Sequence, residues 1–162
     1  MAAGRKPSVW TRPWRRVFRP FLNPDEKARI AKAIADMERG TTGEIHVHVI
    51  GRTRGHDPLE LARHLFHKLG LHQTDGRNGV LILVSHLDHR FAIWGDEGVH
   101  AKAGQPLWER AKKVLLEEFS RRRYAAGIEA CVREVGRELA SQFSKNEPGP
   151  GKNQLPDDVT GS

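Results

Sequence analysis

The sequence predicts an α/β fold in which a mixed β-sheet is flanked by helices, and two observations lead to this prediction. First, segments with helical and strand patterns follow one another in the order helix, strand, helix, strand, strand, helix, helix. A strand–helix–strand unit followed by a hairpin gives a mixed, mostly parallel sheet plus an antiparallel hairpin. Second, residues 80–84 (VLILV) are all apolar, so this strand should be central and covered on both faces. A chain of 162 residues suits one such domain.

Four stretches carry apolar residues at helical spacing. The first predicted helix begins at Asn23-Pro24, because asparagine suits the N-cap and proline suits the first helical position. It is expected to end at Gly40. The other predicted helices span residues 58–69, 106–119 and 124–143.

Three stretches are predicted to be strands. Residues 44–50 alternate, with apolar side chains at 45, 47 and 49 on one face and polar side chains at 44, 46 and 48 on the other. Residues 80–85 form the apolar central strand, and residues 90–95 pair with it through a turn at 87–89. The first two strands are joined by a helix and should run parallel, whereas the third returns antiparallel.

This topology brings three loops to one edge of the sheet, at the start of the first two strands and the end of the third. Five oxygen-bearing side chains belong to these loops: Glu44, Asp75, Asn78, Asp96 and Glu97. Carboxylates that are brought together repel unless a cation or protons intervene. Because hard oxygen ligands suit Ca²⁺ and, less well, Mg²⁺, the five residues are candidate metal ligands. The alternative is local: the Asn-Gly pair makes a turn, and Asp96 only accepts hydrogen bonds from loop amides.

The net charge of +7 belongs to the beginning of the chain. Residues 1–22 hold six basic and no acidic residues, which leaves 21 basic against 20 acidic residues in the remainder. Aromatic residues are interleaved with these cations, so residues 5–19 are a candidate contact for an anionic membrane surface or nucleic acid. The alternative is an extension whose aromatic side chains pack on the domain. We therefore divide the chain into a basic aromatic tail at 1–22, a domain at 23–145, and a Pro/Gly linker with a second tail at 146–162.

Several function classes are disfavoured by the sequence. A single cysteine, Cys131, allows neither an intrachain disulfide nor a thiolate-based zinc site. P-loop, GxGxxG and GxSxG motifs are absent, and no apolar run reaches the length of a membrane span. Histidine pairs at 46/48, 64/67 and 86/89 suit Zn²⁺ or Ni²⁺ only if two pairs come together. The opposite edge of the sheet carries Arg52, Arg54, His56 and His86, which could attract an anion such as phosphate.

Four short motifs, in this order and spacing, resemble the TPM-domain family of small, soluble, stand-alone bacterial type. They are TGEIHV at 42–47, NGVLI at 78–82, AIWGDEG at 92–98 and QLPD at 154–157. The resemblance covers about residues 24–158 and implies a three-layer α/β/α sandwich. Some members of the family bind calcium at the acidic rim, phosphatase activity has been ascribed to others, and membrane-bound members are linked to photosystem repair or receptor assembly.

Carried over residue by residue, the resemblance points to Glu44, Asn78 and Asp96, with Asp75 and Glu97 as neighbours. Members often carry aspartate where this chain has Arg77 or Asn78, and the positive charge of Arg77 lowers the expected cation affinity. The resemblance therefore implies a cytoplasmic Ca²⁺-binding module that acts through a protein partner. Two alternatives are a metal-dependent phosphatase, and an adaptor that binds a membrane or nucleic acid through the basic tail.

Overall fold

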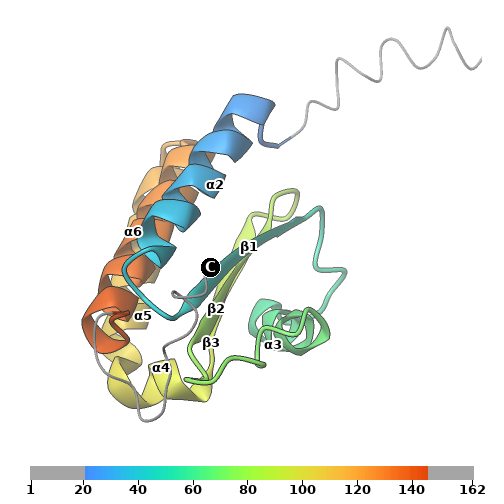
Figure 1. Cartoon of the computed structure of the whole chain (residues 1–162). Coiled ribbons are helices and arrows are strands. Elements are labelled where there is room, and N and C mark those ends of the chain that lie inside the picture. Colours follow the sequence, from blue (N-terminus) through green and yellow to red (C-terminus); the bar gives the residue numbers. More distant parts are fainter. Residues whose placement is uncertain (1–20, 146–162) are drawn as a thin grey trace, which may run out of the picture.

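The computed structural model describes residues 21–145, which form a three-stranded mixed sheet packed with five helices (Figure 1). The predicted α/β class is confirmed. The basic tail up to residue 20 and the linker and tail at 146–162 lie outside the described residues. The elements are α2 (Pro24–Glu38), β1 (Glu44–Ile50), α3 (Pro58–Lys68), β2 (Gly79–Ser85), β3 (Arg90–Gly95), α4 (Glu97–Lys102), α5 (Gly104–Ser120) and α6 (Tyr124–Gln142).

The sheet has the order β1-β2-β3, so the apolar strand β2 is central, as predicted. β1 pairs with β2 in parallel, with Glu44 opposite Gly79, and β2 pairs with β3 antiparallel, with Val80 opposite Gly95. All seven residues of β2 are buried. The expectation of a mostly parallel sheet is wrong for the described residues, because one strand pair is parallel and one is antiparallel.

Helices cover both faces of the sheet. On one face, α2, α5 and α6 pack on side chains of all three strands, and the fully buried Ile82 lies in this cluster. On the other face α3 packs alone, where Ala62 and Phe66 contact Leu81 and Leu83 of β2. The two groups of helices are separated by the sheet (Figure 1). Because β2 contributes side chains to both clusters, it needs apolar residues at every position.

The start of α2 follows the prediction from its cap. Asn23 Oδ1 accepts a hydrogen bond of 2.8 Å from the Glu26 N–H, and Glu26 Oε1 accepts one of 2.9 Å from the Asn23 N–H. This capping box satisfies two backbone donors at once, and Pro24 fills the first turn.

The sequence predicts a loop at Asp96 and Glu97, whereas the structure forms the short helix α4 there. Six residues hold too few apolar positions to show a helical period. Asp96 is its N-cap and accepts a hydrogen bond from the Glu97 N–H. α5 also begins two residues earlier than expected, at Gly104, so that Pro106 lies in its first turn.

The two ends of the described chain are joined beside β1. α2 packs against α6, and Thr42 N donates a hydrogen bond of 3.0 Å to Phe143 O. The buried Thr41 Oγ1 lies 3.0 Å from Leu139 O and 2.6 Å from Phe143 O, and it accepts a bond of 3.0 Å from Gly43 N. Between residues 21 and 145, none of the helices has the length and apolar character needed to cross a membrane.

Candidate functional site

The three loops predicted to converge do meet at one edge of the sheet, which we call the rim. Backbone hydrogen bonds join them: Glu44 N donates to Asn78 O at 3.4 Å, and Asp96 N donates to Gly79 O at 3.0 Å. These bonds place the chain before β1, the chain before β2 and the end of β3 side by side. The topological argument from sequence therefore located the rim correctly.

Asp96 is the buried carboxylate of the rim, with 5% of its surface exposed. Arg77 binds it through both ends of its fork: Nε lies 2.8 Å from Oδ2, and Nη2 lies 2.9 Å from Oδ1. Oδ1 also accepts a bond of 2.8 Å from Glu97 N. The hydrogen bond with Asp96 is the largest cause of a raised pKa of the Arg77 guanidinium. The carboxylate is thus neutralised by a positive charge from its own chain.

Arg77 holds a second carboxylate of the rim as well. Its Nη1 lies 3.1 Å from Glu97 Oε2, and the Glu97 side chain is largely exposed. The Arg77 backbone has φ of 49°, a left-handed conformation that non-glycine residues seldom adopt. Its carbonyl accepts a bond of 2.9 Å from Gly98 N, which fixes the guanidinium beside the start of α4. The sequence predicts only that Arg77 adds positive charge at the rim. It does not predict the ion pairs of Arg77 with Asp96 and Glu97.

Asn78 is turned inward and is 1% exposed. Its Nδ2 donates to Thr42 Oγ1 at 3.0 Å, and its backbone N donates to Thr74 Oγ1 at 3.0 Å. Its Oδ1 is buried and has no hydrogen-bond partner. An unpaired buried carbonyl oxygen is costly in free energy, so this atom is a candidate ligand for a water molecule or a cation.

Glu44 and Asp75 lie on the exposed side of the rim. Neither carboxylate forms a hydrogen bond or an ion pair with another described residue. Throughout residues 21–145, no group of three or more His, Cys, Asp or Glu side chains is arranged to hold a metal ion. A cation at the rim would therefore need the side chains of these acids to move.

The rim residues fit a hard cation in chemistry, but not in their present arrangement. Asp96, Glu97 and the unpaired oxygen of Asn78 supply the oxygen donors that Ca²⁺ accepts. However, the guanidinium of Arg77 lies against both carboxylates. The fit therefore depends on the displacement of Arg77.

The paired histidines do not gather into a site among the described residues. His46 and His48 lie beside one another on β1, with ring centroids 6.3 Å apart. Burial lowers the pKa of His46, and the neighbouring His48 adds to this effect. His67 Nδ1 lies 2.9 Å from Arg63 O, which occupies one of its ring nitrogens. His46 and His48 are half-buried and His67 is exposed.

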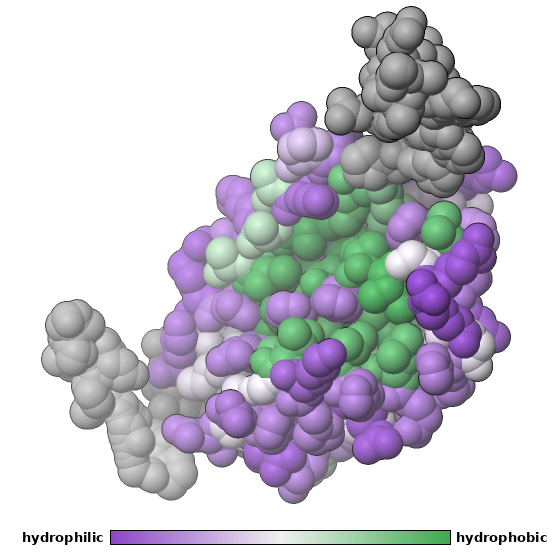
Figure 2. Space-filling model, turned by 90° about the vertical axis from the view of Figure 1, so that its right-hand side faces the viewer, coloured by the Kyte–Doolittle hydropathy of each residue, from purple (hydrophilic) through white to green (hydrophobic). Residues whose placement is uncertain are grey.

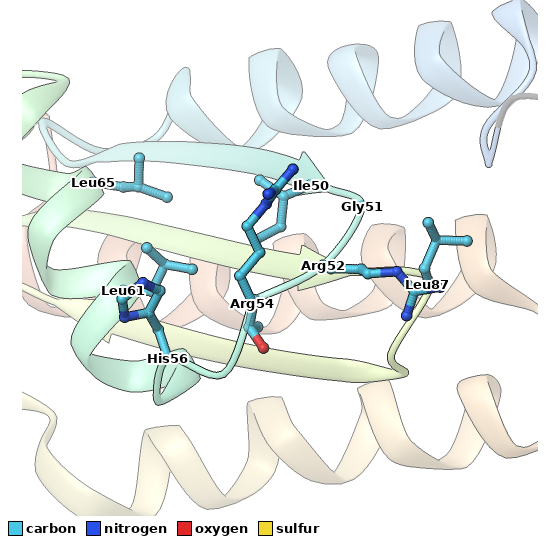
Figure 3. Close-up of a pocket in the computed structure, with 9 residues that line it drawn as sticks. Ile50, Gly51, Arg52, Arg54, His56, Leu61, Leu65 and Leu87 are labelled. Atoms are coloured by element: carbon cyan, nitrogen blue, oxygen red, sulfur yellow. The ribbon is translucent and has the colours of Figure 1, made fainter.

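A pocket of about 530 Å³ lies at the opposite edge of the sheet, between the end of β1, α3 and the hairpin turn (Figure 3). Its basic side chains are Arg52, Arg54 and His56, all in the β1–α3 loop. No described residue forms an ion pair with either arginine. Its apolar lining is Ile50, Leu61, Leu65 and Leu87. We call this the basic pocket. The sequence had identified its charges, but not the apolar wall that α3 provides.

Asp88 fixes the loop that carries the basic pocket. Its Oδ2 accepts hydrogen bonds of 2.9 Å from Thr53 N and from Thr53 Oγ1, and its Oδ1 accepts a short one from Ser85 Oγ. The bond from Ser85 is the largest cause of a pKa of Asp88 lowered to about 2, and the bond from the Thr53 backbone adds to it. No sequence pattern predicts this network, because an Asp-His pair is common in hairpin turns.

The Asp88 network should make stability depend on pH in acid. Because the pKa of Asp88 is lowered in the folded state, the contribution of Asp88 to stability is complete above the ordinary pKa of 3.8. This contribution is lost as the pH falls towards 2. Asp88→Asn should therefore have a lower free energy of unfolding than the wild type at pH 5. The difference between the two proteins should be smaller at pH 2. Urea unfolding at pH 5, 3 and 2 measures this. Asp75→Asn, which changes an exposed acid without a described partner, is the matched control, and an equal pH profile for both variants would contradict the assignment.

Comparison with known proteins gives the same family as the motifs. Residues 17–138 match the TPM domain. Among curated proteins, no match is found. The NMR structure of the BA42 protein from the psychrophilic bacterium Bizionia argentinensis is 31% identical, with a TM-score of 0.73 over 78% of this chain and 87% of that chain.

Two further NMR structures share the fold at 16% identity. The N-terminal domain of the cg2496 protein from Corynebacterium glutamicum has a TM-score of 0.61, over 82% of this chain and 84% of its own. The N-terminal domain of a protein from P. gingivalis has a TM-score of 0.63, over 76% and 80%. The first three motifs, which carried the resemblance in the sequence, contribute residues to the three loops of the rim. From the domain match over most of its length and its likeness to BA42, the chain belongs to the TPM domain family.

Proposed function

We propose that this TPM domain is a weak Ca²⁺-binding module in which the cation competes with Arg77, and that it acts through a protein partner. The observation that carries the proposal is the position of the Arg77 guanidinium, which contacts both oxygens of Asp96 and one oxygen of Glu97. Arg77 already places a positive charge where the carboxylates of Asp96 and Glu97 converge, so the rim is suited to binding a cation.

The remaining charge at the rim supports binding of a further cation. Together with Arg77, the five candidate residues hold four carboxylates and one guanidinium, a formal charge of −3. Glu44 and Asp75 are exposed and have no described partner, so their side chains are free to turn towards an ion. Asp96, Glu97 and Asn78 would hold the ion once Arg77 has left. When bound, Ca²⁺ would supply a fixed positive charge in place of a movable guanidinium.

Competition with Arg77 sets the expected affinity. The ion must replace a bidentate pair and then bind ligands that come from three loops. We therefore expect a Kd of about 10⁻³ M for the wild type, at the weak end of protein calcium sites. Release of Arg77 would place its side chain, already 42% exposed, on the surface next to α4. This change in surface charge is how a partner would sense the ion.

Arg77→Ala should tighten Ca²⁺ binding by about tenfold, because affinity follows the charge and freedom of the ligand set. Ca²⁺ titration, followed by the amide shifts of Asn78, Asp96 and Gly98, measures the Kd. The matched control is Arg39→Ala, which removes an arginine that pairs with Asp36 and forms no ion pair with a rim carboxylate. It should leave the Kd unchanged.

Arg77→Ala combined with Asp96→Asn should lose the gain in affinity, because Asp96 is the carboxylate that the guanidinium masks most closely. If Arg77→Ala keeps a folded spectrum and 10 mM Ca²⁺ (about ten times the Kd expected for the wild type) shifts none of the rim amides, the rim is not a cation site. Retained affinity in the double variant would place the ion elsewhere.

The two alternative functions stay predictions. A phosphatase would need a cation and a phosphoryl group at the same rim, and it would depend on Asp96. An adaptor would use residues 5–19, which lie outside the described part of the chain.

A further inference from the structure

The outer edge of β1 is open within the described part of the chain. β1 is at one end of the strand order and pairs only with β2. Glu44 N donates to Asn78 O, and Ile50 O accepts from His86 N, so the backbone groups of these two residues face β2. The direction of the backbone N–H and C=O groups alternates along a strand. The groups of the even-numbered residues of β1 therefore face β2, and the groups of residues 45, 47 and 49 face outward.

The outward groups are available for another strand. Ile45 N donates to Glu38 Oε1 at 2.8 Å, which closes the first position of the edge. No described residue pairs with the outward N–H and C=O groups of Val47 and Val49. An unpaired strand edge is a template for an extended segment, because the backbone supplies the hydrogen bonds and the flanking pockets supply selectivity.

The far end of this edge lies on a side of the molecule that carries an apolar area and the basic pocket. Figure 2 shows an apolar area framed by hydrophilic side chains on the side of the molecule that lies to the right in Figure 1, where α3 and the strand ends are found. Val47 and Val49 are only half-buried. The basic pocket follows directly after Ile50, and Arg54 extends over it from the β1–α3 loop (Figure 3). A segment that fits should be extended, partly apolar, and acidic where it passes Arg52 and Arg54.

The chain itself contains such a segment beyond the described residues. Residues 152–159 read KNQLPDDV, in which an apolar residue is followed by two acids. The described chain ends close to the start of β1, since Ser144 bridges to Thr41 in antiparallel direction. Residues 146–151 (NEPGPG) can reverse the direction of the chain, because Pro-Gly pairs favour turns.

We propose that residues 152–158 of this chain add to the open edge of β1 as a parallel strand and place Asp157 and Asp158 at the basic pocket. The lengths agree: seven residues match the seven residues of β1, which span about 23 Å. Pro156 fits an edge strand if Leu155 and Asp157 make the backbone bonds to β1, so that its missing N–H faces outward.

The charges and the tether make this contact favourable. Arg52 and Arg54 have no described ion-pair partner, and Asp88 directs its carboxylate to Thr53 and Ser85. The pocket therefore keeps its positive charge. A segment linked to the same domain has an effective concentration in the millimolar range, so even weak docking is well populated.

Paramagnetic relaxation in the full chain tests the proposal. Thr160→Cys provides one site for a spin label, because Cys131 is fully buried and burial raises its pKa to about 12, which keeps it unreactive. We expect loss of amide signals from residues 51–56 and none from α5. Broadening absent at 51–56 would overturn the proposal. So would broadening seen only when spin-labelled and ¹⁵N-labelled chains are mixed, since the occupant would then be a second copy.

Hydrogen exchange adds a readout of the backbone bonds. The amides of Val47 and Val49 should be protected in the full chain, and Asp157→Asn with Asp158→Asn should reduce their protection by about three- to tenfold, the scale of two partly exposed ion pairs. Glu147→Gln, which changes an acid of the same segment before the turn, is the matched control and should leave protection unchanged. Equal protection in the wild type and the double variant would overturn the proposal.

Discussion

Replacing Gly98 with alanine is expected to destabilise the domain by about 1–3 kcal/mol or more, and to separate two of the loops that form the rim. A Cβ at this position would lie 2.2 Å from Gly76 O and 2.6 Å from Arg77 O. Both contacts are backbone atoms, so a side-chain rotation cannot relieve them. The chain must move, and the hydrogen bond from Gly98 N to Arg77 O is lost with it. Urea unfolding and the amide shifts of the rim measure the two effects.

Gly51→Ala is the control for Gly98→Ala. A Cβ at Gly51 would meet only Leu87 Cδ1 at 3.5 Å, an ordinary contact. This variant should unfold at nearly the wild-type urea concentration. A Gly98→Ala variant that unfolds at the same concentration as the wild type would show that the two loops are not packed as closely as the structure has them.

Ile82→Ala should have the largest effect on stability, lowering the free energy of unfolding by about 2–5 kcal/mol. Ile82 is fully buried at the middle of the central strand and lies between Val47 and Ile93. It packs under the three helices of the larger cluster, where neighbouring elements limit how far the structure can collapse into the cavity. Chemical denaturation at neutral pH gives the value.

Two substitutions with smaller expected effects serve as controls for Ile82→Ala. Ile82→Val, which removes one methyl group, should cost about 0.5–1.5 kcal/mol. Leu69→Ala should change stability little, because Leu69 is 42% exposed at the end of α3. If Ile82→Ala were no more harmful than Leu69→Ala, the assignment of β2 to the centre of the core would be wrong.

Much of the fold could be predicted because its signals are local. The unbroken apolar run of β2 predicted its burial on both faces, and Asn23-Pro24 predicted the start of α2. The position of the rim followed from strand direction alone, which is why the loops of residues as far apart as Glu44 and Asp96 could be placed at one edge of the sheet. Each of these inferences needed only a period, a cap or a handedness rule.

The contacts within the site could not be predicted because they depend on three-dimensional geometry. Arg77 and Asp96 are separated by 19 positions, and no sequence pattern marks a bidentate pair across two loops. The inward turn of Asn78 and the hydrogen bonds of Asp88 likewise depend on which neighbours reach them. Whether the rim binds calcium is therefore decided by a contact that sequence patterns do not encode, and it stays a prediction.

The pairing of α2 with α6 has a consequence for how the chain is made. α2 and β1 leave the ribosome early, yet α2 packs on α6, and the carbonyl that Thr42 bonds belongs to Phe143. Synthesis adds about 5–20 residues per second, so these first elements wait for several seconds without their partners. During this interval α2 exposes its apolar stripe, including Ile30 and Ala33. Completion of the fold is thus postponed until nearly the last described residue has been translated.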